Sequence, residues 1–403
     1  MTTPRVNAGS AAGLLLLALS GTGCVERVIH DLGGLQRCGD GVPAPGEVCL
    51  GQGRRFTLTI EGIEGLLLRA ADFGGDGHVD LLVVGLDPGG AVSIRLWPGR
   101  GDGDFEPTLD PGVRGCSAYA VAGDANGDPA LDLLVDECGP SMSVLLGHSS
   151  GSFQGPVPVA TGLQTRSSGL VDLDADGRRE VIVLGAFDDA SWGISVAERS
   201  DGGAYDPPVV SVGGTTDDFD PRGLGVLDVD RDGYFDALLV HPSHPDGLAL
   251  ARGGPGFTFE RPMPVGPAGL VADTSMVRDL DEDDVPDVLA VSFAEEALVF
   301  LRSEGRQLVE RGRTSVPDLR LGPAGAGDMD ADGHLDLLLF EPGSRKLQAW
   351  LGRGDGSFED PLALDLEVPI GQIALVDLDE DGALDIVAGT FESGTLQILL
   401  SDP

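Results

Sequence analysis

Apolar positions in this chain fall into short runs separated by turn residues, and the same order of runs returns about every 50 residues. In one unit, residues 225–227 (GVL) precede an acidic loop and residues 237–240 (ALLV) follow it. A third apolar run ends in a Gly-rich turn and an aromatic residue, and a fourth extended stretch leads into the next unit. Four short strands per unit, with no helix between them, predict the blades of a β-propeller.

The acidic loop occurs seven times, and its first residue is an Asp at steps of 48 to 56 residues. These starting residues are Asp72, Asp124, Asp172, Asp228, Asp279, Asp328 and Asp377. The last unit ends after its third apolar run, whereas residues 54–60 (RRFTLTI) form an extra strand before the first loop. An open ring would expose strand edges, so we expect this strand to complete the last blade. The sequence therefore predicts an all-β, seven-bladed propeller closed by an N-terminal strand.

The N-terminus has the layout of a secretory signal, with Arg5, an apolar run over residues 13–19 and small residues up to Cys24. The run is too short to span a bilayer permanently. The segment before Cys24 resembles the lipobox of bacterial lipoproteins, although Gly21 stands where an aliphatic residue is usual. We predict a lipoprotein signal peptide over residues 1–23, lipidation of Cys24 and an outer-membrane lipoprotein facing the periplasm or the cell surface. The alternative is an extracellular protein without a lipid.

The remaining cysteines divide into two pairs, which an oxidising compartment would join as disulfides. Cys38 and Cys49 lie in a linker over residues 24–54, and Cys116 and Cys138 flank the turn at Gly127. The second pair would face across two antiparallel strands, at a distance that a disulfide can bridge. Non-reducing peptide mapping should find both bridges, and a disulfide that contains Cys24 would refute both the pairing and the lipid anchor.

The acidic loops follow the pattern D-x-D-x-D-G-x-x-D, which suits Ca²⁺, a hard cation that takes six to eight oxygen ligands. Carboxylates at positions 1, 3 and 5 converge when the chain curls, and Gly at position 6 permits the positive φ that the turn needs. Position 7 offers a backbone carbonyl and position 9 closes the shell. Mg²⁺ fits less well, because it prefers a tighter octahedron and retains water.

The loops differ in how completely they match this pattern. Four have every acid and the Gly, and their predicted ligands are Asp172, Asp174, Asp176, Glu180, Asp228, Asp230, Asp232, Asp236, Asp328, Asp330, Asp332, Asp336, Asp377, Asp379, Asp381 and Asp385. A fifth has Asp284 in place of the Gly, and its predicted ligands are Asp279, Asp281, Asp283 and Asp287. Two are degenerate, with Pro129 or Gly74 in place of a pattern residue, and their predicted ligands are Asp124, Asn126, Asp128, Asp132, Asp72, Asp76 and Asp80.

Residues Arg55 to Pro403, with their seven acidic loops in register, resemble the FG-GAP/VCBS repeats also found at the head of integrin α chains. The resemblance implies a propeller domain over residues 55–403 with several calcium ions. It also implies use in recognition or adhesion, although related propellers carry polysaccharide lyase or hydrolase activities. Fold alone does not decide between these functions.

The formal net charge of −40 excludes nucleic acid and anionic membrane surfaces as good partners, so membrane contact would be through the lipid alone. Acids spread evenly would indicate a solvated surface, whereas these acids recur at fixed loop positions. The alternative to cation sites is a set of acidic turns held by Asx hydrogen bonds. Three or four carboxylates forced together without a cation would repel, which favours calcium.

These observations predict a non-catalytic binding or adhesion scaffold at the cell surface or in the periplasm, with a protein or glycan ligand. An enzyme would need acids, His or Arg that converge outside the acidic loops, and the sequence shows no such set. His241 and His244 lie in a Pro-bounded loop, and residues 147–151 (GHSSG) match a hydrolase motif at a place where other units have a hairpin turn. We therefore assign both segments to turns.

Overall fold

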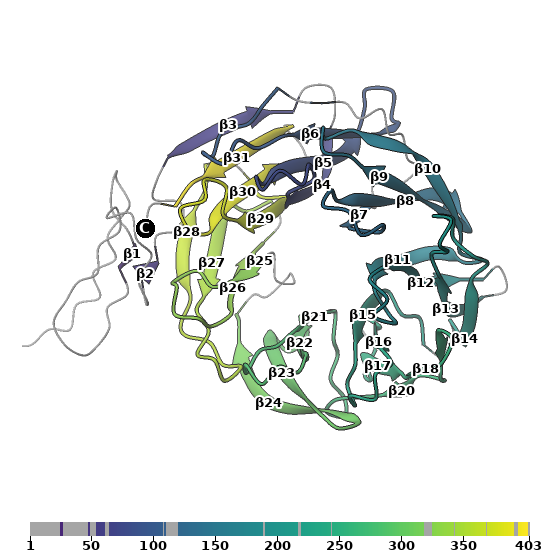
Figure 1. Cartoon of the computed structure of the whole chain (residues 1–403). Coiled ribbons are helices and arrows are strands. Elements are labelled where there is room, and N and C mark those ends of the chain that lie inside the picture. Colours follow the sequence, from purple (N-terminus) through teal and green to yellow (C-terminus); the bar gives the residue numbers. More distant parts are fainter. Residues whose placement is uncertain are drawn as a thin grey trace, which may run out of the picture.

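A computed structural model of the chain shows a ring of β-sheets (Figure 1). The structure describes residues 25–26, 47–48, 54–60, 64–107, 109, 120–187, 190–216, 219–242, 244–317, 325–341, 343–367, 369–390 and 394–401. Among these residues, no helix has the length and apolarity that a membrane crossing requires. All five cysteine side chains lie outside the described part, so both predicted disulfides and the lipidation of Cys24 stay predictions.

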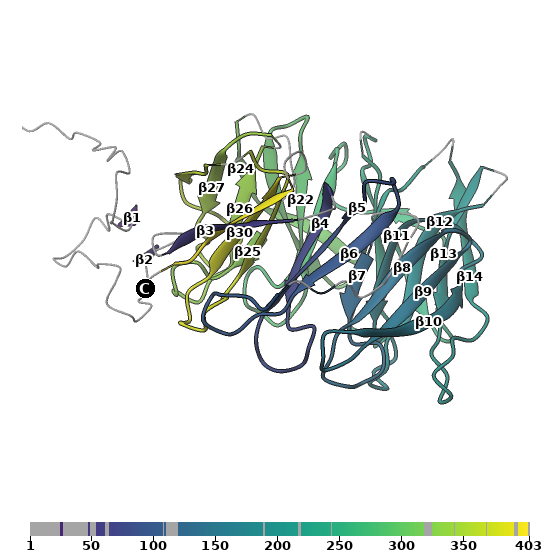
Figure 2. The same cartoon turned by 90° about the horizontal axis from the view of Figure 1, so that it is seen from above.

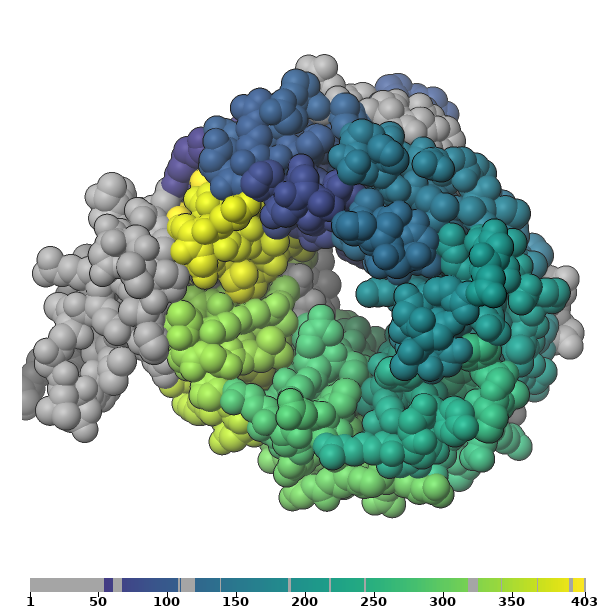
Figure 3. All heavy atoms as spheres, viewed as in Figure 1, coloured from purple at the N-terminus to yellow at the C-terminus, as the bar shows by residue number. Residues whose placement is uncertain are grey.

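Seven sheets surround a central opening, as the prediction of a seven-bladed propeller requires. The innermost strand of each sheet faces this opening, and the space-filling view shows that it is not filled (Figure 3). Seen from above, the sheets stand side by side around the ring (Figure 2). The all-β, seven-bladed fold is thereby confirmed.

The strands of each blade follow one another from the centre outwards. The first four blades are β4 (Glu64–Ala71), β5 (Asp80–Leu86) and β6 (Val92–Trp97); β7 (Ala120–Gly123), β8 (Asp132–Gly139), β9 (Ser141–Gly147) and β10 (Phe153–Ala160); β11 (Gln164–Val171), β12 (Glu180–Ala186), β13 (Ser191–Ala197) and β14 (Val209–Thr215); and β15 (Gly223–Leu227), β16 (Asp236–Val240), β17 (Leu248–Ala251) and β20 (Met263–Pro264). Blade 4 also carries a short hairpin of β18 (Gly253–Gly254) and β19 (Thr258–Phe259).

The other three blades repeat this order. They are β21 (Thr274–Arg278), β22 (Asp287–Ser292), β23 (Ala297–Glu304) and β24 (Gln307–Ser315); β25 (Gly325–Gly327), β26 (Asp336–Phe340), β27 (Lys346–Trp350) and β28 (Leu362–Asp365); and β29 (Gln372–Val376), β30 (Asp385–Thr390), β31 (Thr395–Leu399) and β3 (Arg55–Thr59). Two further short strands, β1 (Val25–Glu26) and β2 (Glu47–Val48), pair with each other.

Each junction between neighbouring blades has its own hydrophobic core. The second strand of a blade is buried on both faces, as in β16, where all five residues are buried. One of its faces packs against the preceding blade and the other against the following blade, so Leu239 and Leu238 belong to different clusters. Seven such clusters run around the ring, one at each junction. This arrangement explains why continuous apolar runs, rather than alternating ones, follow the acidic loops.

The ring is closed by pairing of the two ends of the propeller. β3 pairs antiparallel with β31 over five residue pairs, from Arg55 opposite Leu399 to Thr59 opposite Thr395. Phe56 and Leu58 of β3 pack against the core shared by blades 7 and 1. The predicted closure by the N-terminal strand is therefore confirmed.

A charge on the inward face of β3 should open this closure. We expect Leu58→Asp to lower the free energy of unfolding by about 2 kcal/mol or more, because the carboxylate would replace a side chain packed in the core. Thr57→Asp is the matched control: Thr57 is exposed on the opposite face, so its change should stay within about 0.5 kcal/mol. Denaturant unfolding of both variants measures the difference, and equal effects would show that closure does not depend on this packing.

Candidate metal centres

Each acidic loop joins the first and second strands of its blade, so all seven loops lie on one face of the ring. We number the residues of every loop from 1 to 9, starting at its first Asp. Position 9 is the first residue of the second strand in all seven blades, and its side chain is buried. The loop is thus fixed to the sheet by its last residue.

The carboxylate at position 9 joins its loop to the backbone at or just beyond the end of the third strand of the same blade. In Asp336, Oδ2 accepts a hydrogen bond from the Met329 N–H at 2.6 Å, and Oδ1 accepts one from the Gly352 N–H at 2.7 Å. The same two bonds recur in Asp80, Asp132, Asp236, Asp287 and Asp385. Position 9 therefore has a structural role besides any part in metal binding.

Burial raises the pKa of these position-9 carboxyls, although the backbone N–H groups partly oppose the shift. The pKa rises to about 7 in Glu180, to about 6 in Asp287, and to about 7 in both Asp336 and Asp385. The neighbouring carboxylates of the same loop raise it further. Each loop therefore has a charged oxygen cluster that is costly to keep ionised without a cation.

Position 1 holds the curl of the loop. In Asp328, Oδ1 accepts a hydrogen bond from the Asp332 N–H at 3.1 Å, and Oδ2 accepts one from the Gly333 N–H at 2.9 Å. Gly333 at position 6 has a φ of 90°, and Asp284 takes the same role in its loop with a φ of 61°. Asp can thus replace Gly at this turn.

Position 4 also adopts a positive φ, which the sequence did not indicate. The residues concerned are Gly75, Gly127, Ala175, Arg231, Glu282, Ala331 and Glu380. Five of the seven are not Gly, and each has a φ between 54° and 60°. Because the fold holds the loops in this conformation, their backbone oxygens and carboxylates are already arranged before any ion binds.

Five of the seven loops bring three carboxylates together, with one oxygen of each lying within 4.8 Å of the others. The groups are Asp172, Asp174 and Glu180; Asp228, Asp230 and Asp236; Asp279, Asp281 and Asp287; Asp328, Asp330 and Asp332; and Asp377, Asp379 and Asp385. These loops are the four complete ones and the one with Asp284. The remaining predicted ligands of these loops, Asp176, Asp232, Asp283, Asp336 and Asp381, lie outside the close groups.

Several of these carboxylates have a buried oxygen without a hydrogen-bond partner among the described residues. They include Oδ1 of Asp230, Asp281, Asp377 and Asp379. The Asp230 side chain is only 8% exposed, so water does not readily compensate its charge. A buried, unpaired carboxylate oxygen is costly unless a cation or donor satisfies it. The loops therefore fit an oxygen-seeking divalent ion.

Arginines partly balance the charge of two loops. Arg306 Nε lies 3.1 Å from Asp230 Oδ2, and Arg302 Nε lies 3.0 Å from Asp281 Oδ2. Arg302 also pairs with Asp283 at position 5, which lowers the pKa of that carboxyl. Both arginines contact Oδ2, and Oδ1 of Asp230 and Asp281 has no hydrogen-bond partner among the described residues. These contacts are therefore compatible with an ion bound to Oδ1.

The two degenerate loops do not form a close group of three carboxylates among the described residues. In the loop at Asp124, the Asn126 Nδ2 donates a hydrogen bond to Asp128 Oδ2 at 2.8 Å. In the loop at Asp72, Gly74 supplies no side-chain ligand. The predicted ligands Asp72, Asp76, Asp80, Asp124, Asn126, Asp128 and Asp132 are the weakest of the set.

Histidines at position 7 connect neighbouring blades. His78 Nδ1 lies 2.6 Å from Oε1 of Glu380, which is at position 4 of the preceding blade, and His334 pairs with Glu282 in the same way. The hydrogen bond to the Glu raises the pKa of each His. The sequence predicted only a backbone carbonyl ligand at position 7. The side-chain contact between blades was not predicted and is shown by the structure alone.

His241 and His244 have local roles. Their rings stack with centroids 4.8 Å apart, and Phe219 contacts both of them edge-on. Nδ1 of each accepts a backbone N–H, from Asp220 and Asp246 respectively. The hydrolase-like motif at residues 147–151 ends a strand and forms a tight turn, in which the Gly151 N–H bonds to the His148 carbonyl. Both segments are turns, as assigned from the sequence.

Comparison with known proteins supports the repeat identity. The FG-GAP-like repeat family matches residues 72–135 and 328–388, which contain four of the seven acidic loops. Comparison with curated proteins gives no match.

Solved structures show the same fold at low sequence identity. An Agrocybe aegerita lectin that recognises non-reducing terminal N-acetylglucosamine is 18% identical, with a TM-score of 0.56 over 79% of this chain and 87% of the lectin. The periplasmic gluconolactonase of Pseudomonas aeruginosa is 16% identical, with a TM-score of 0.50 over 78% of this chain and 98% of that enzyme. Such likeness concerns the fold, which serves a binding protein in one case and an enzyme in the other.

Proposed function

We propose that this seven-bladed propeller of FG-GAP-like repeats is a calcium-stabilised, non-catalytic binding or adhesion scaffold. The observation that carries the proposal is the position of its exposed apolar side chains. Of the six large hydrophobic residues exposed in the described chain, five lie in blades 3 and 4: Val209, Val210, Val212, Tyr234 and Met263. Exposed apolar side chains concentrated in two neighbouring blades favour contact with a partner.

Calcium is the cation that fits the loops best. Every side-chain donor at positions 1, 3, 5 and 9 of the five close groups is a carboxylate, and hard oxygen ligands are those that Ca²⁺ prefers. A bound ion would neutralise the charge of the carboxylates. The conformation of the loop is set by the chain's own residues, because position 1 holds the curl and position 9 joins the loop to the sheet.

The strongly perturbed carboxyls favour a structural role over catalysis. Glu180, Asp287, Asp336 and Asp385 have raised pKa values, but they are buried and accept backbone N–H groups. Substrate cannot reach groups in that environment without opening the sheet. An enzyme, a polysaccharide lyase or hydrolase, is the alternative, and its support is limited to a fold shared with the gluconolactonase.

The scaffold would be held at the outer membrane by a lipid on Cys24, with a protein or glycan as its ligand. This localisation rests on the signal-like segment over residues 1–23. Mass spectrometry of the N-terminal peptide should find an acylated Cys24, and Cys24→Ser should release the protein from the membrane fraction. An unmodified, soluble wild-type protein would contradict the anchor but not the binding function.

A glycan array and a polysaccharide-degradation screen, run on the same calcium-loaded protein, test binding against catalysis. We expect retention of a ligand without its cleavage. Val212 and Met263 are 67% and 66% exposed, so Val212→Asp and Met263→Asp should fold normally and weaken retention. Release of shortened polysaccharide would overturn the non-catalytic assignment.

A further inference from the structure

At two junctions between blades, position 4 of one acidic loop contacts position 7 of the next, and a pair of side chains fills the space between them. A Glu at position 4 of one blade meets a His at position 7 of the next, as Glu380 meets His78. The Gly of the following hairpin packs closely on this pair: a Cβ built on Gly101 would lie 2.5 Å from His78 Nδ1 and 2.6 Å from Glu380 Oε1. These junctions are closed by an acid and a base from the chain itself.

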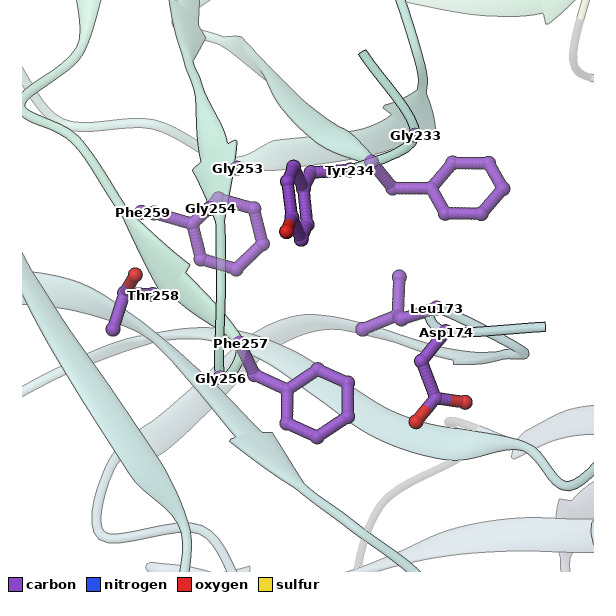
Figure 4. A pocket seen from close by; sticks show the side chains of 11 residues that line it. Leu173, Asp174, Gly233, Tyr234, Gly253, Gly254, Gly256, Phe257, Thr258 and Phe259 are labelled. Atoms are coloured by element: carbon purple, nitrogen blue, oxygen red, sulfur yellow. The ribbon is translucent and has the colours of Figure 1, made fainter. Parts of the chain in front are cut away.

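The junction of blades 3 and 4 has different residues at these positions and is open. Position 4 is Ala175, whose methyl group is too short to cross as Glu380 does, and position 7 is Tyr234, which is 41% exposed. A pocket of about 240 Å³ lies here, between the acidic loops of the two blades. Figure 4 shows Tyr234, Phe257 and Phe259 on one side and Leu173 and Asp174 on the other.

Two of the three aromatic residues labelled in Figure 4, Phe257 and Phe259, come from a hairpin in an unusual conformation. Phe257 has a φ of 59°, a region that bulky side chains rarely occupy, and it follows Gly256 with a φ of 68°. The hairpin of β18 and β19 holds it there, with Gly253 opposite Phe259. Phe257 and Phe259 are only partly buried against the junction core. Strain kept at a partly exposed aromatic residue points to a role in contact with a ligand.

The charge of the pocket is one-sided. The Asp174 side chain is exposed, and no basic residue is among those that line the pocket. Arg178 of the same loop pairs with Asp176 and Asp201, and Arg252, next to the lining residue Gly253, lies 3.8 Å from Asp230 Oδ2. A divalent ion together with Arg178 and Arg179 would balance the four carboxylates of this loop, so the wider attraction for a cation comes from the net charge of −40 on the whole chain. The pocket therefore has the carboxylate and the aromatic rings that a cation-binding site needs, and none of its lining residues supplies a cation.

We propose that this pocket binds a cationic side chain, Arg or Lys, presented by a basic partner polypeptide. The head group would lie against the ring faces of Tyr234 and Phe257 while Asp174 accepts its hydrogen bonds through the carboxylate oxygen that it does not offer to the metal group, an arrangement that suits guanidinium in particular. At the closed junctions, the basic member of the pair is a His of the chain itself. The inference rests on the proposed function, because it identifies the class of partner that the scaffold binds.

A fluorescein-labelled peptide with a central Arg-Arg pair is the probe, and the same peptide with citrulline is its uncharged control. Anisotropy at physiological salt and saturating calcium should show binding of the Arg peptide alone. Tyr234→Ala should weaken this binding about tenfold, whereas Tyr234→Phe, which keeps the ring, should change it little. Because Tyr234 is largely outside the core, both variants should fold.

A second pair of variants separates the pocket from general attraction to an acidic protein. Ala175→Arg would supply the missing cation from within, on a backbone that accepts Arg, since Arg231 has the same position and a φ of 57° in the next loop. It should abolish peptide binding. Ala331→Arg adds the same charge at position 4 of blade 6, where the following blade has Ala383, and should leave binding unchanged.

Three results would overturn the inference. Equal loss with Ala175→Arg and Ala331→Arg, or equal binding of the citrulline peptide, would show that the pocket does not select a cation. Binding of a neutral oligosaccharide that Tyr234→Ala abolishes would assign the pocket to a sugar and leave the scaffold function intact. Cleavage of a polysaccharide by the same protein would overturn the scaffold function itself.

Discussion

Removal of calcium is expected to lower the Tm of this propeller by on the order of 10 °C or more. Without the ion, carboxylates with unpartnered buried oxygens, such as those of Asp230 and Asp379, would remain together in most blades. One site saturated about 100-fold above its dissociation constant adds roughly 2.7 kcal/mol to folding. Five such loops would together rival the about 5–15 kcal/mol by which a typical domain is stable.

Thermal scans with a chelator and with excess Ca²⁺ make the comparison, and two variants localise the effect. Asp330→Ala removes a buried ligand from a complete loop, whereas Asp76→Ala removes one from a degenerate loop. Asp330→Ala should cost more in calcium, and the difference between the variants should shrink in chelator. Superimposable scans of the wild-type protein would mean that the acids are solvated turns.

The pH dependence of stability should change sign between the metal-free and the calcium-loaded protein. In the metal-free protein, burial raises the pKa of Asp336 and Asp385 to about 7, well above the value of about 4 for an unfolded carboxyl. The folded state therefore binds these protons more tightly than the unfolded state does. Stability is then highest below about pH 4 for these groups and falls as the pH rises towards 7, by up to about 1.4 kcal/mol per group and pH unit.

Other charges of the metal-free protein act in the same direction. The raised pKa values of His78 and His334 mean that their pairs with Glu380 and Glu282 are lost as the pH rises. The self-repulsion of a chain with a net charge of −40 also grows as carboxyls ionise. Calcium reverses the trend, because its ligands must be deprotonated and protons compete with the ion.

Urea unfolding at about pH 5 and about pH 8, with chelator and with calcium, tests this reversal. The metal-free protein should be more stable at the lower pH and the loaded protein at the higher pH. Asp385→Asn should flatten the metal-free dependence, since the amide does not titrate in this range and keeps one acceptor oxygen. Parallel curves in the two conditions would show that the position-9 carboxyls are not coupled to a cation.

The regular part of this molecule could be predicted from its sequence because each blade repeats the same chemistry. Seven loop starts, continuous apolar runs and one spare strand were enough to identify the ring and its closure through Arg55–Thr59. Glycine at position 6 showed where the loop turns. These features depend on residues close together in the chain, so local patterns carry them.

Contacts between blades could not be read in this way. The positive φ of Ala175 and Glu380 at position 4 is imposed by the loop as a whole. Because residues of different types occupy this position, the sequence shows no preference that would reveal the conformation. The pairing of His78 with Glu380 joins residues at opposite ends of the chain, which only the closed ring brings together. The same geometry leaves Tyr234 without a counterpart and so produces the pocket. A comparison of the residue at position 4 of each loop with the residue at position 7 of the next loop would have identified this junction from the sequence.

The bound calcium per chain, measured by elemental analysis after equilibrium dialysis, tests the central claim most directly. The five close carboxylate groups predict about five ions per chain, with fewer after substitution of Asp330. A value near zero, at calcium concentrations typical of an extracellular compartment, would contradict the assignment of these loops as calcium sites.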